Sequence, residues 1–159
     1  METNKTTHVY QVYIKATPEA IWEAITKPEW TRRYGYRSIA EYDLRPGGRY
    51  RGLATEEFQS MGMPSVVVDG EVLEVDPPRR LVHTWRFLWD DEVKAEGPTR
   101  VTFDIKPGSN GITSLTVTHE LENAPTTTAQ ITGAIENAGG GWAYVLSDLK
   151  TLLETGSSL

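Results

Sequence analysis

Two histidines fall in segments with the alternating pattern of β-strands, and they are the side chains best placed to contact a ligand through polar atoms. His83 alternates with Leu81 and Trp85, and His119 follows Val117 at the same spacing. Because successive side chains of a strand point to opposite faces, each histidine shares a face with apolar neighbours. Such an imidazole can anchor a ligand carbonyl or hydroxyl, serve as a general acid or base, or simply satisfy a buried hydrogen bond. The sequence leaves all three roles open.

Other catalytic chemistry has little support in the sequence. The chain has no cysteine and three histidines, which excludes a thiolate nucleophile and provides few ligands for a metal. It contains no serine-nucleophile elbow, phosphate-binding glycine loop or paired histidines at helical spacing. If a histidine acts as acid or base, Glu71 or Glu74 is the candidate partner for orienting it. The run Gly139-Gly140-Gly141 follows a polar segment, so it predicts a flexible hinge before a helix. We expect neither a metal site nor a cofactor.

The charge balance argues against a nucleic-acid partner. Sixteen basic and 22 acidic residues give the 159-residue chain a net charge of −6, which repels phosphates overall. The densest basic stretch, residues 32–51, is interrupted by Glu41 and Asp43, so it predicts a solvated strand face. No apolar run is long enough to span a bilayer, and residues 1–7 lack the apolar core of a signal peptide. We therefore expect a cytoplasmic protein without membrane insertion.

The N-terminal part of the chain predicts a strand followed by two short helices. Residues 9–14 are rich in β-branched and aromatic side chains, as is typical of a strand. Thr17 can then cap a helix that Pro18 begins. Pro28 ends that helix, and residues 29–34 predict a second, shorter one.

The middle of the chain predicts an antiparallel meander. Short alternating segments are separated by Pro-Gly and acidic turns, and consecutive strands joined by such turns pair antiparallel. Residues 90–98 read as a polar connector, and residues 123–132 as an irregular stretch in which one frayed helical turn is left open. The expected strands are 40–44, 49–54, 66–75, 80–87, 100–105 and 114–121.

The last part of the chain predicts one long amphipathic helix. Its polar side chains, Ser147, Asp148 and Glu154 among them, fall on the face opposite an apolar stripe, and Gly156 is placed to end it. The stripe consists of Trp142, Val145, Leu146, Leu149, Leu152 and Leu153.

These elements predict an α+β fold in a single domain covering residues 1–159. A curved antiparallel sheet has one apolar face to cover, and the long C-terminal helix has one apolar stripe to bury. The helix should therefore lie across the concave face of the sheet. A strongly curved sheet covered by a single helix tends to leave an internal space near its wide end.

Several segments, taken together in their order and spacing, resemble a known family. It is the group of bacterial homologues of the activator of heat-shock protein 90 ATPase, in the START-like (SRPBCC) superfamily, and the similarity runs from about residue 9 to residue 154. The resemblance implies the helix-grip fold and a hydrophobic cavity but little about any reaction. One departure is that Tyr34-Gly35-Tyr36 interrupts an aromatic pair common among relatives. The segments are VYIKATPE with IW (12–22), DLRPGGRY (43–50), GEVLEVDPP (70–78), LVHTW (81–85) and GW with two leucines (141–149).

The leading hypothesis is a domain that binds a small hydrophobic or aromatic molecule between the sheet and the C-terminal helix. The alternatives are a cyclase- or dehydratase-type enzyme that uses a pocket histidine, and a protein-interaction module similar to a co-chaperone. We expect a monomer or weak dimer, and a protein partner stays open. Trp30, Trp89, Met61 and Met63 are candidates for the entrance of the pocket. The candidate ligand-binding residues are His83, Trp85, Phe103, Val117, His119, Trp142 and Leu146.

Overall fold

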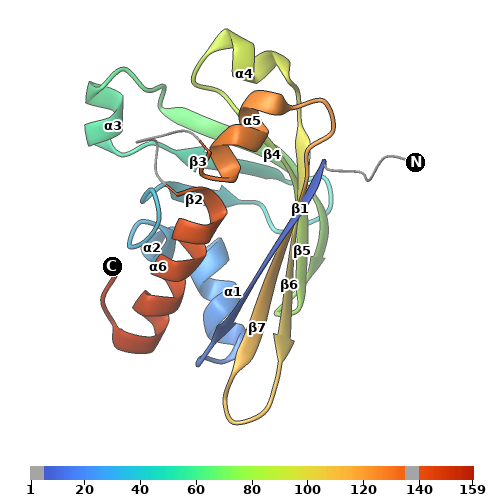
Figure 1. Ribbon diagram of the computed structural model, residues 1–159, viewed down its shortest axis with the longest axis vertical. Helices are drawn as coiled ribbons and strands as arrows, with labels where there is room; N and C mark the ends of the chain where they lie inside the picture. Colours follow the sequence, from blue (N-terminus) through green and yellow to red (C-terminus); the bar gives the residue numbers. More distant parts are fainter. Residues whose placement is uncertain (1–5, 135–139) are drawn as a thin grey trace.

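The computed structural model describes residues 6–134 and 140–159, and it contains one seven-stranded antiparallel sheet. The strand order is β1-β7-β6-β5-β4-β3-β2, so the first strand lies at one edge and the second at the other (Figure 1). The strands are β1 (Thr7–Ile14), β2 (Ile39–Tyr42), β3 (Arg49–Leu53), β4 (Val66–Asp76), β5 (Arg80–Phe87), β6 (Thr99–Pro107) and β7 (Thr113–Glu120). The helices are α1 (Pro18–Thr26), α2 (Pro28–Thr31), α3 (Glu56–Ser60), α4 (Asp91–Ala95), α5 (Pro125–Ile131) and α6 (Gly141–Thr155).

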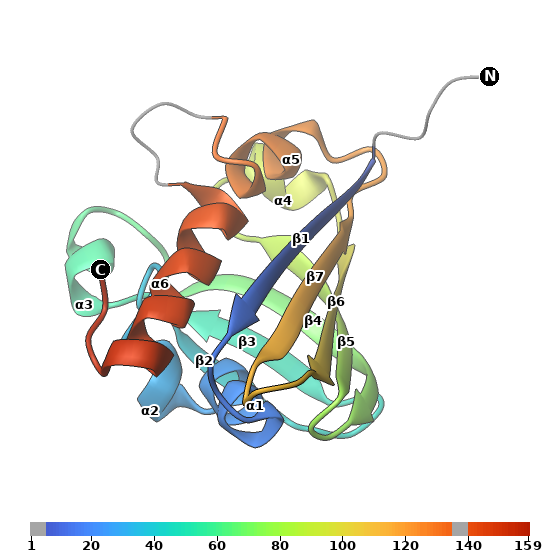
Figure 2. The same ribbon diagram turned by 60° about the horizontal axis from the view of Figure 1, so that its bottom comes forward.

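The sheet bends around the long helix α6. Figure 2 shows α6 lying across the concave side, with α1 and α2 near one end of the sheet and α4 and α5 near the other. Inward-facing residues of β5, β6 and β7 are buried together with the apolar stripe of α6, with Leu81 and Leu115 fully enclosed and Leu149 almost so. This arrangement is the helix-grip fold that the resemblance implies, and the alternation along the strands predicted it.

Local signals set the ends of the first and last helices as expected. The side chain of Thr17 accepts a hydrogen bond from the amide of Ala20 at the start of α1, and Pro18 occupies the first turn. At the other end of the chain, Gly156 has a φ of 86° and donates its amide to the carbonyl of Leu152. A residue with a side chain is disfavoured in this left-handed conformation, so the glycine ends α6 as predicted.

Three short helices differ from the expectations. Residues 123–132 were expected to be irregular with a frayed helical turn left open, and they contain the seven-residue α5; the connector 90–98 contains α4, and α3 follows β3. Each has five to seven residues, which is too short for an apolar periodicity to emerge. The capping residues Thr55 and Asp90 were the available local signals, since each accepts a hydrogen bond from an amide three residues later. The second helix is also shorter than predicted, because α2 ends at Thr31.

Asp148 corrects the predicted polar face of α6. It was placed among solvent-facing residues, but it is 1% exposed. Its two carboxylate oxygens accept hydrogen bonds from the amides of Gly35 and Leu159, each at 2.8 Å. The carboxylate therefore joins α6 to the segment after α2 and to the end of the chain. Helical spacing could not show this, because both partners come from irregular segments.

Candidate functional site

A cavity of about 620 Å³ lies between α6, α5 and the sheet, mostly against β2, β3, β4 and β5, with one residue each from β6 and β7. This volume is within the range typical of small-molecule sites. No charged side chain of the described residues lines it, and the polar side-chain groups on its wall are a few hydroxyls, one amide and the indoles of its tryptophans. The wall is mostly aromatic and aliphatic. Its aromatic rings include Tyr42, Tyr50, Trp85, Phe87, Trp89, Phe103 and Trp142.

Four of the predicted site residues lie on this wall. Trp85 and Phe103 come from the inward faces of β5 and β6, and Trp142 and Leu146 come from the first turns of α6. The ring of Trp142 is 5.4 Å from that of Trp85 and 5.9 Å from that of Phe103, measured between centroids. The helix stripe and the strand alternation thus meet at one aromatic cluster, although the two segments are far apart in the chain.

The other three predicted residues, His83, Val117 and His119, lie behind the wall. All three are fully buried, and none lines the cavity. The register explains why the histidines are close: His119 is opposite Val101, and Val101 is opposite His83. His8 on β1 is opposite His119 in the same row. The structure therefore brings the three histidines of the chain into one line across four strands.

Both ring nitrogens of His83 are engaged. Its Nδ1 is 2.7 Å from the carbonyl oxygen of Thr84, which can only accept, so Nδ1 carries the proton and donates. Its Nε2 is 3.1 Å from the hydroxyl of Tyr42 and accepts from it. Burial lowers the pKa of His83 to about 4, although the bond to Thr84 acts in the opposite direction. The imidazole is neutral at physiological pH.

His119 has the opposite tautomer. The indole Nε1 of Trp142 donates to its Nδ1 at 3.1 Å, so the proton is on Nε2. That Nε2 lies 2.7 Å from the hydroxyl of Thr99, which itself donates to the carbonyl oxygen of Trp85. Burial lowers the pKa of His119 to about 3, with smaller contributions from His83 and His8. This chain of bonds fixes Trp142, a wall residue, from behind.

The two glutamates considered as partners for these histidines form no hydrogen bond with them. Glu71 and Glu74 are exposed, and Glu74 forms an ion pair with Arg80 at 3.0 Å. The imidazoles are oriented instead by Tyr42, Thr99 and Trp142. An acid or base must reach the proton that it transfers, whereas both imidazoles are saturated and shielded. Their geometry supports a structural role.

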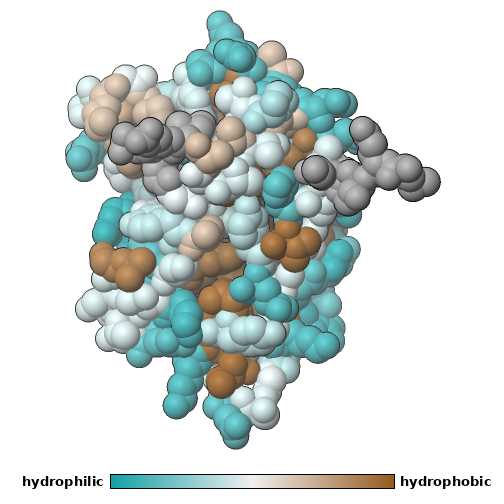
Figure 3. Space-filling model, viewed as in Figure 1, coloured by the Kyte–Doolittle hydropathy of each residue, from teal (hydrophilic) through white to brown (hydrophobic). Residues whose placement is uncertain are grey.

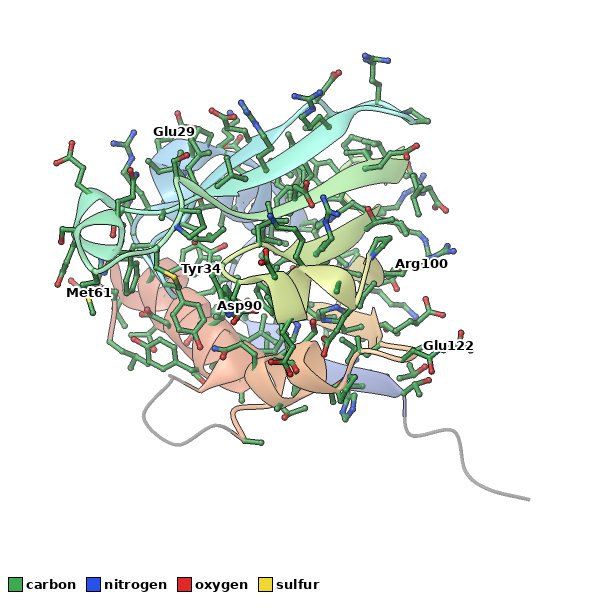
Figure 4. The ribbon with its side chains drawn as sticks, turned by 90° about the horizontal axis from the view of Figure 1, so that it is seen from above. Glu29, Tyr34, Met61, Asp90, Arg100 and Glu122 are labelled. Carbon is green, nitrogen blue, oxygen red and sulfur yellow. The ribbon has the colours of Figure 1, made fainter. Side chains whose placement is uncertain are left out.

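The candidate entrance residues separate into two pairs. Trp89 and Met63 line the cavity, together with Phe58 of α3. Met61 is 71% exposed and lies at the outer edge of the molecule, whereas Tyr34 lies inside (Figure 4). Trp30 is away from the cavity wall, and its ring is 4.8 Å from the guanidinium carbon of Arg33. Near α3 the wall is therefore formed by Phe58 and Met63, and Met61 does not line the cavity.

Sequence reasoning missed a group of tyrosines on the wall. Tyr34 and Tyr36 follow α2, and Tyr42 and Tyr50 lie on β2 and β3. Between the first two, Gly35 has a φ of 62°, and a Cβ there would stand 3.3 Å from Val145 on α6. The glycine that interrupts the aromatic pair thus allows the loop to approach the helix closely. Alternation along β2 and β3 was the only signal for Tyr42 and Tyr50. Because both strands are short and follow loops, that alternation did not show which of their side chains face inward.

Helix α5 closes one side of the cavity through Gln130 and Ile131. The carboxylate of Glu96, just after α4, accepts hydrogen bonds from the amides of Thr126 and Thr127 at the start of α5, at 2.7 and 2.8 Å. Burial pushes the pKa of Glu96 upward, but these bonds outweigh it and leave the pKa below its usual value. The ionised carboxylate therefore holds α5 against α4.

Two further properties limit the kinds of site that the described residues can form. Within residues 6–134 and 140–159, no cluster of three or more histidine, aspartate or glutamate side chains is arranged to hold a metal ion. In the same ranges, no helix is both long and apolar enough to cross a membrane.

The curved antiparallel sheet around α6 defines a protein of the helix-grip class with an apolar cavity, and comparison with known proteins specifies the family. Residues 15–154 match the family described as activator of Hsp90 ATPase homolog 1-like protein. The chain belongs to this family, as the resemblance implied. None of the curated proteins matches the chain in sequence.

Solved structures with the same fold come from varied sources. The protein NE0264 from Nitrosomonas europaea is 19% identical, with a TM-score of 0.69 and 98% of each chain covered. An Hsp90 activator from Plasmodium falciparum is also 19% identical, with a TM-score of 0.67 and 94% of this chain and 96% of that chain covered. DynU16, a protein in the dynemicin biosynthetic locus, is 22% identical with a TM-score of 0.68; the match covers 97% of this chain but 49% of that one. These likenesses establish the fold alone.

Proposed function

We propose that this protein binds a small hydrophobic or aromatic molecule in the cavity between α6 and the sheet. The observation that carries the proposal is the cavity itself, about 620 Å³ in volume and walled by aromatic and aliphatic side chains without a charged group among the described residues. A packed interior has few voids larger than a water molecule. A space of this size and composition is therefore better explained by an apolar occupant.

The geometry gives less support to the two alternatives. A cyclase- or dehydratase-type reaction was expected to use His83 or His119, but both imidazoles are neutral, saturated and behind the wall. An interaction module requires an exposed apolar surface. On the face seen in Figure 3 the surface is mixed, and hydrophobic groups gather in a short band where α6 meets β1. DynU16 is linked by its locus to biosynthesis of a small molecule, which is consistent with a ligand cavity.

Native mass spectrometry of the purified protein, followed by thermal unfolding with a panel of uncharged aromatic compounds, tests the proposal. A ligand that binds only the folded state stabilises it by mass action, by about 2.7 kcal/mol at one hundred times its dissociation constant. We expect an added mass or at least one compound that raises the unfolding temperature. If no compound in a broad panel does so and no added mass is found, the interaction-module alternative replaces this proposal.

A matched pair of variants locates the binding. Ala54 lines the cavity, whereas Ala143 is exposed on the solvent face of α6. Ala54→Leu should reduce the ligand-induced thermal shift because the added carbons occupy cavity space, and Ala143→Leu should leave it unchanged. Equal shifts in the two variants would place the ligand outside the cavity.

A further inference from the structure

The hydroxyl of Tyr50 is a polar group on the cavity wall without a hydrogen-bond partner among residues 6–134 and 140–159. Tyr50 lies on β3 and is 5% exposed. Its ring centroid is 4.6 Å from that of Tyr42 and 4.3 Å from that of His83, and it stacks on Trp85 at 5.9 Å. These contacts hold the ring in place, so the position of the hydroxyl is set by the packing behind it.

The surroundings of this hydroxyl are apolar. The oxygen lies 3.5 Å from the position that a Cβ on Gly52 would occupy, a place bordered by the side chain of Val68. Burial raises the pKa of Tyr50, so the hydroxyl keeps its proton. No acceptor among the described residues is placed to take this proton. The hydroxyl is therefore ready to donate to any acceptor that enters the cavity.

The other three tyrosine hydroxyls on the wall each form a hydrogen bond with the protein, two of them as donors and that of Tyr36 as an acceptor. Tyr34 donates to the carbonyl oxygen of Ala24 at 2.8 Å, Tyr42 bonds to His83, and Tyr36 accepts from the amide of Gly141 at 3.0 Å. Beside Tyr50, the indole Nε1 of Trp85 is buried and likewise has no partner among the described residues. The wall between β3 and β5 thus holds two hydrogen-bond donors that the protein itself does not satisfy.

Building on the proposed function, we propose that the cavity selects an uncharged aromatic molecule that carries a carbonyl oxygen, a ketone or a quinone, and that the Tyr50 hydroxyl donates a hydrogen bond to this oxygen. The carbonyl supplies the acceptor that Tyr50 lacks. A carboxylate or an amine would lose its hydration without an opposite charge on the described wall, which is costly. The aromatic walls provide the apolar contact area for the rest of the molecule.

Two probes that differ by one oxygen test this assignment. Fluorenone carries a carbonyl where fluorene has a methylene, and their dissociation constants can be measured by quenching of tryptophan fluorescence or by calorimetry. A net hydrogen bond of about 1 kcal/mol corresponds to about fivefold in affinity. We expect the wild type to bind fluorenone about fivefold or more tightly than fluorene. In Tyr50→Phe this preference should vanish, with the affinity for fluorene unchanged.

The control variant is Tyr13→Phe, which removes the hydroxyl of an exposed tyrosine on β1 and should keep the wild-type preference. Since the Tyr50 hydroxyl has no partner in the described protein, Tyr50→Phe should also keep the wild-type unfolding temperature. If the wild type binds both probes equally, or if Tyr50→Phe keeps the preference for fluorenone, the assignment of Tyr50 is wrong while the cavity still binds apolar ligands. If neither these probes nor the wider panel binds, the proposed function fails first.

Discussion

The concave face of the sheet has two regions, which differ in whether their polar side-chain groups have hydrogen-bond partners. In the sealed region, around His83 and His119, each imidazole nitrogen has a partner and neither imidazole lines the cavity. In the open region, around Tyr50 and Trp85, aromatic rings line a cavity of about 620 Å³, and two donors have no acceptor among the described residues. The regions are neighbours, since the rings of Tyr50 and His83 are 4.3 Å apart.

The difference shows that burial and residue type do not identify a binding group. Histidine is the residue whose chemistry suggests a site, yet here it serves as a satisfied part of the core. Tyrosine was not singled out, yet it provides the free donor. A polar group is available to a ligand only when the protein has not already paired it. The predictions below use this contrast, beginning with the largest expected effect.

Two leucine truncations compare how tightly the regions are packed. Leu81 is fully buried in the sealed region, and Leu146 borders the cavity. Leu81→Ala should lower the free energy of unfolding by about 2–5 kcal/mol because it creates a new void. Leu146→Ala should cost at least about 1 kcal/mol less, since one side of that residue already lacks partner atoms. Equal losses in denaturant unfolding would contradict the division into regions.

Acid should destabilise the protein through the sealed region. Folding lowers the pKa of His83 from 6.5 to about 4 and that of His119 to about 3. Below pH 6.5 these two histidines therefore bind protons in the unfolded chain but stay neutral in the folded chain. The free energy of unfolding thus falls as the pH falls from 6.5 toward 4. Between pH 7 and 5.5 the two histidines together should remove about 2–3 kcal/mol.

The measurement is the free energy of unfolding at several pH values, for the wild type and for His83→Gln with His119→Gln. The double variant should show a much flatter dependence between pH 7 and 5.5. A wild-type stability that stays constant over this range would mean that the imidazoles are not buried as neutral groups.

His119→Gln separates a structural from a ligand-binding role. One amide cannot reproduce both bonds of the imidazole, to Thr99 and to Trp142, so the variant should lose about 1–3 kcal/mol of stability. The dissociation constant for an aromatic probe, measured well below the unfolding temperature, should stay within about twofold. Unchanged stability combined with weakened binding would return His119 to the ligand site.

Asp148→Asn tests whether the cavity wall of the open region is held in place by the hydrogen bonds of the buried Asp148 carboxylate. An amide side chain presents one acceptor where the carboxylate presents two, so the amide of Gly35 or of Leu159 loses its partner. We expect a loss of about 1–2 kcal/mol and a smaller ligand-induced thermal shift, because Gly35 is part of the cavity wall. Ser147→Ala, at the exposed neighbouring position on α6, should change stability by less than about 0.5 kcal/mol.

Much of the architecture is determined by the sequence alone. Alternation along 80–87, 100–105 and 114–121 specifies which side chains face inward, and the stripe from Trp142 to Leu152 specifies the face of α6 that is buried. These assignments hold because strand and helix periods are set by backbone geometry, and burial then follows from the chemistry of each face. The family and its helix-grip fold were implied by the resemblance of another set of segments, which includes 43–50 and 70–78.

The tertiary structure decides what the inward-facing residues do. Register places His119, Val101 and His83 in one row, and the approach of Trp142 from α6 completes the bonds of His119. The cavity arises where β2 and β3 meet α6 and α5, four elements from distant parts of the chain. Whether a polar group has a hydrogen-bond partner, and whether a cavity lies beside it, depends on residues that are close in space. Local periodicity contains no information about neighbours that come from elsewhere in the chain. For that reason the sequence predicted a cavity and four of its wall residues, whereas the free hydroxyl of Tyr50 and the buried carboxylate of Asp148 became visible only in the folded chain.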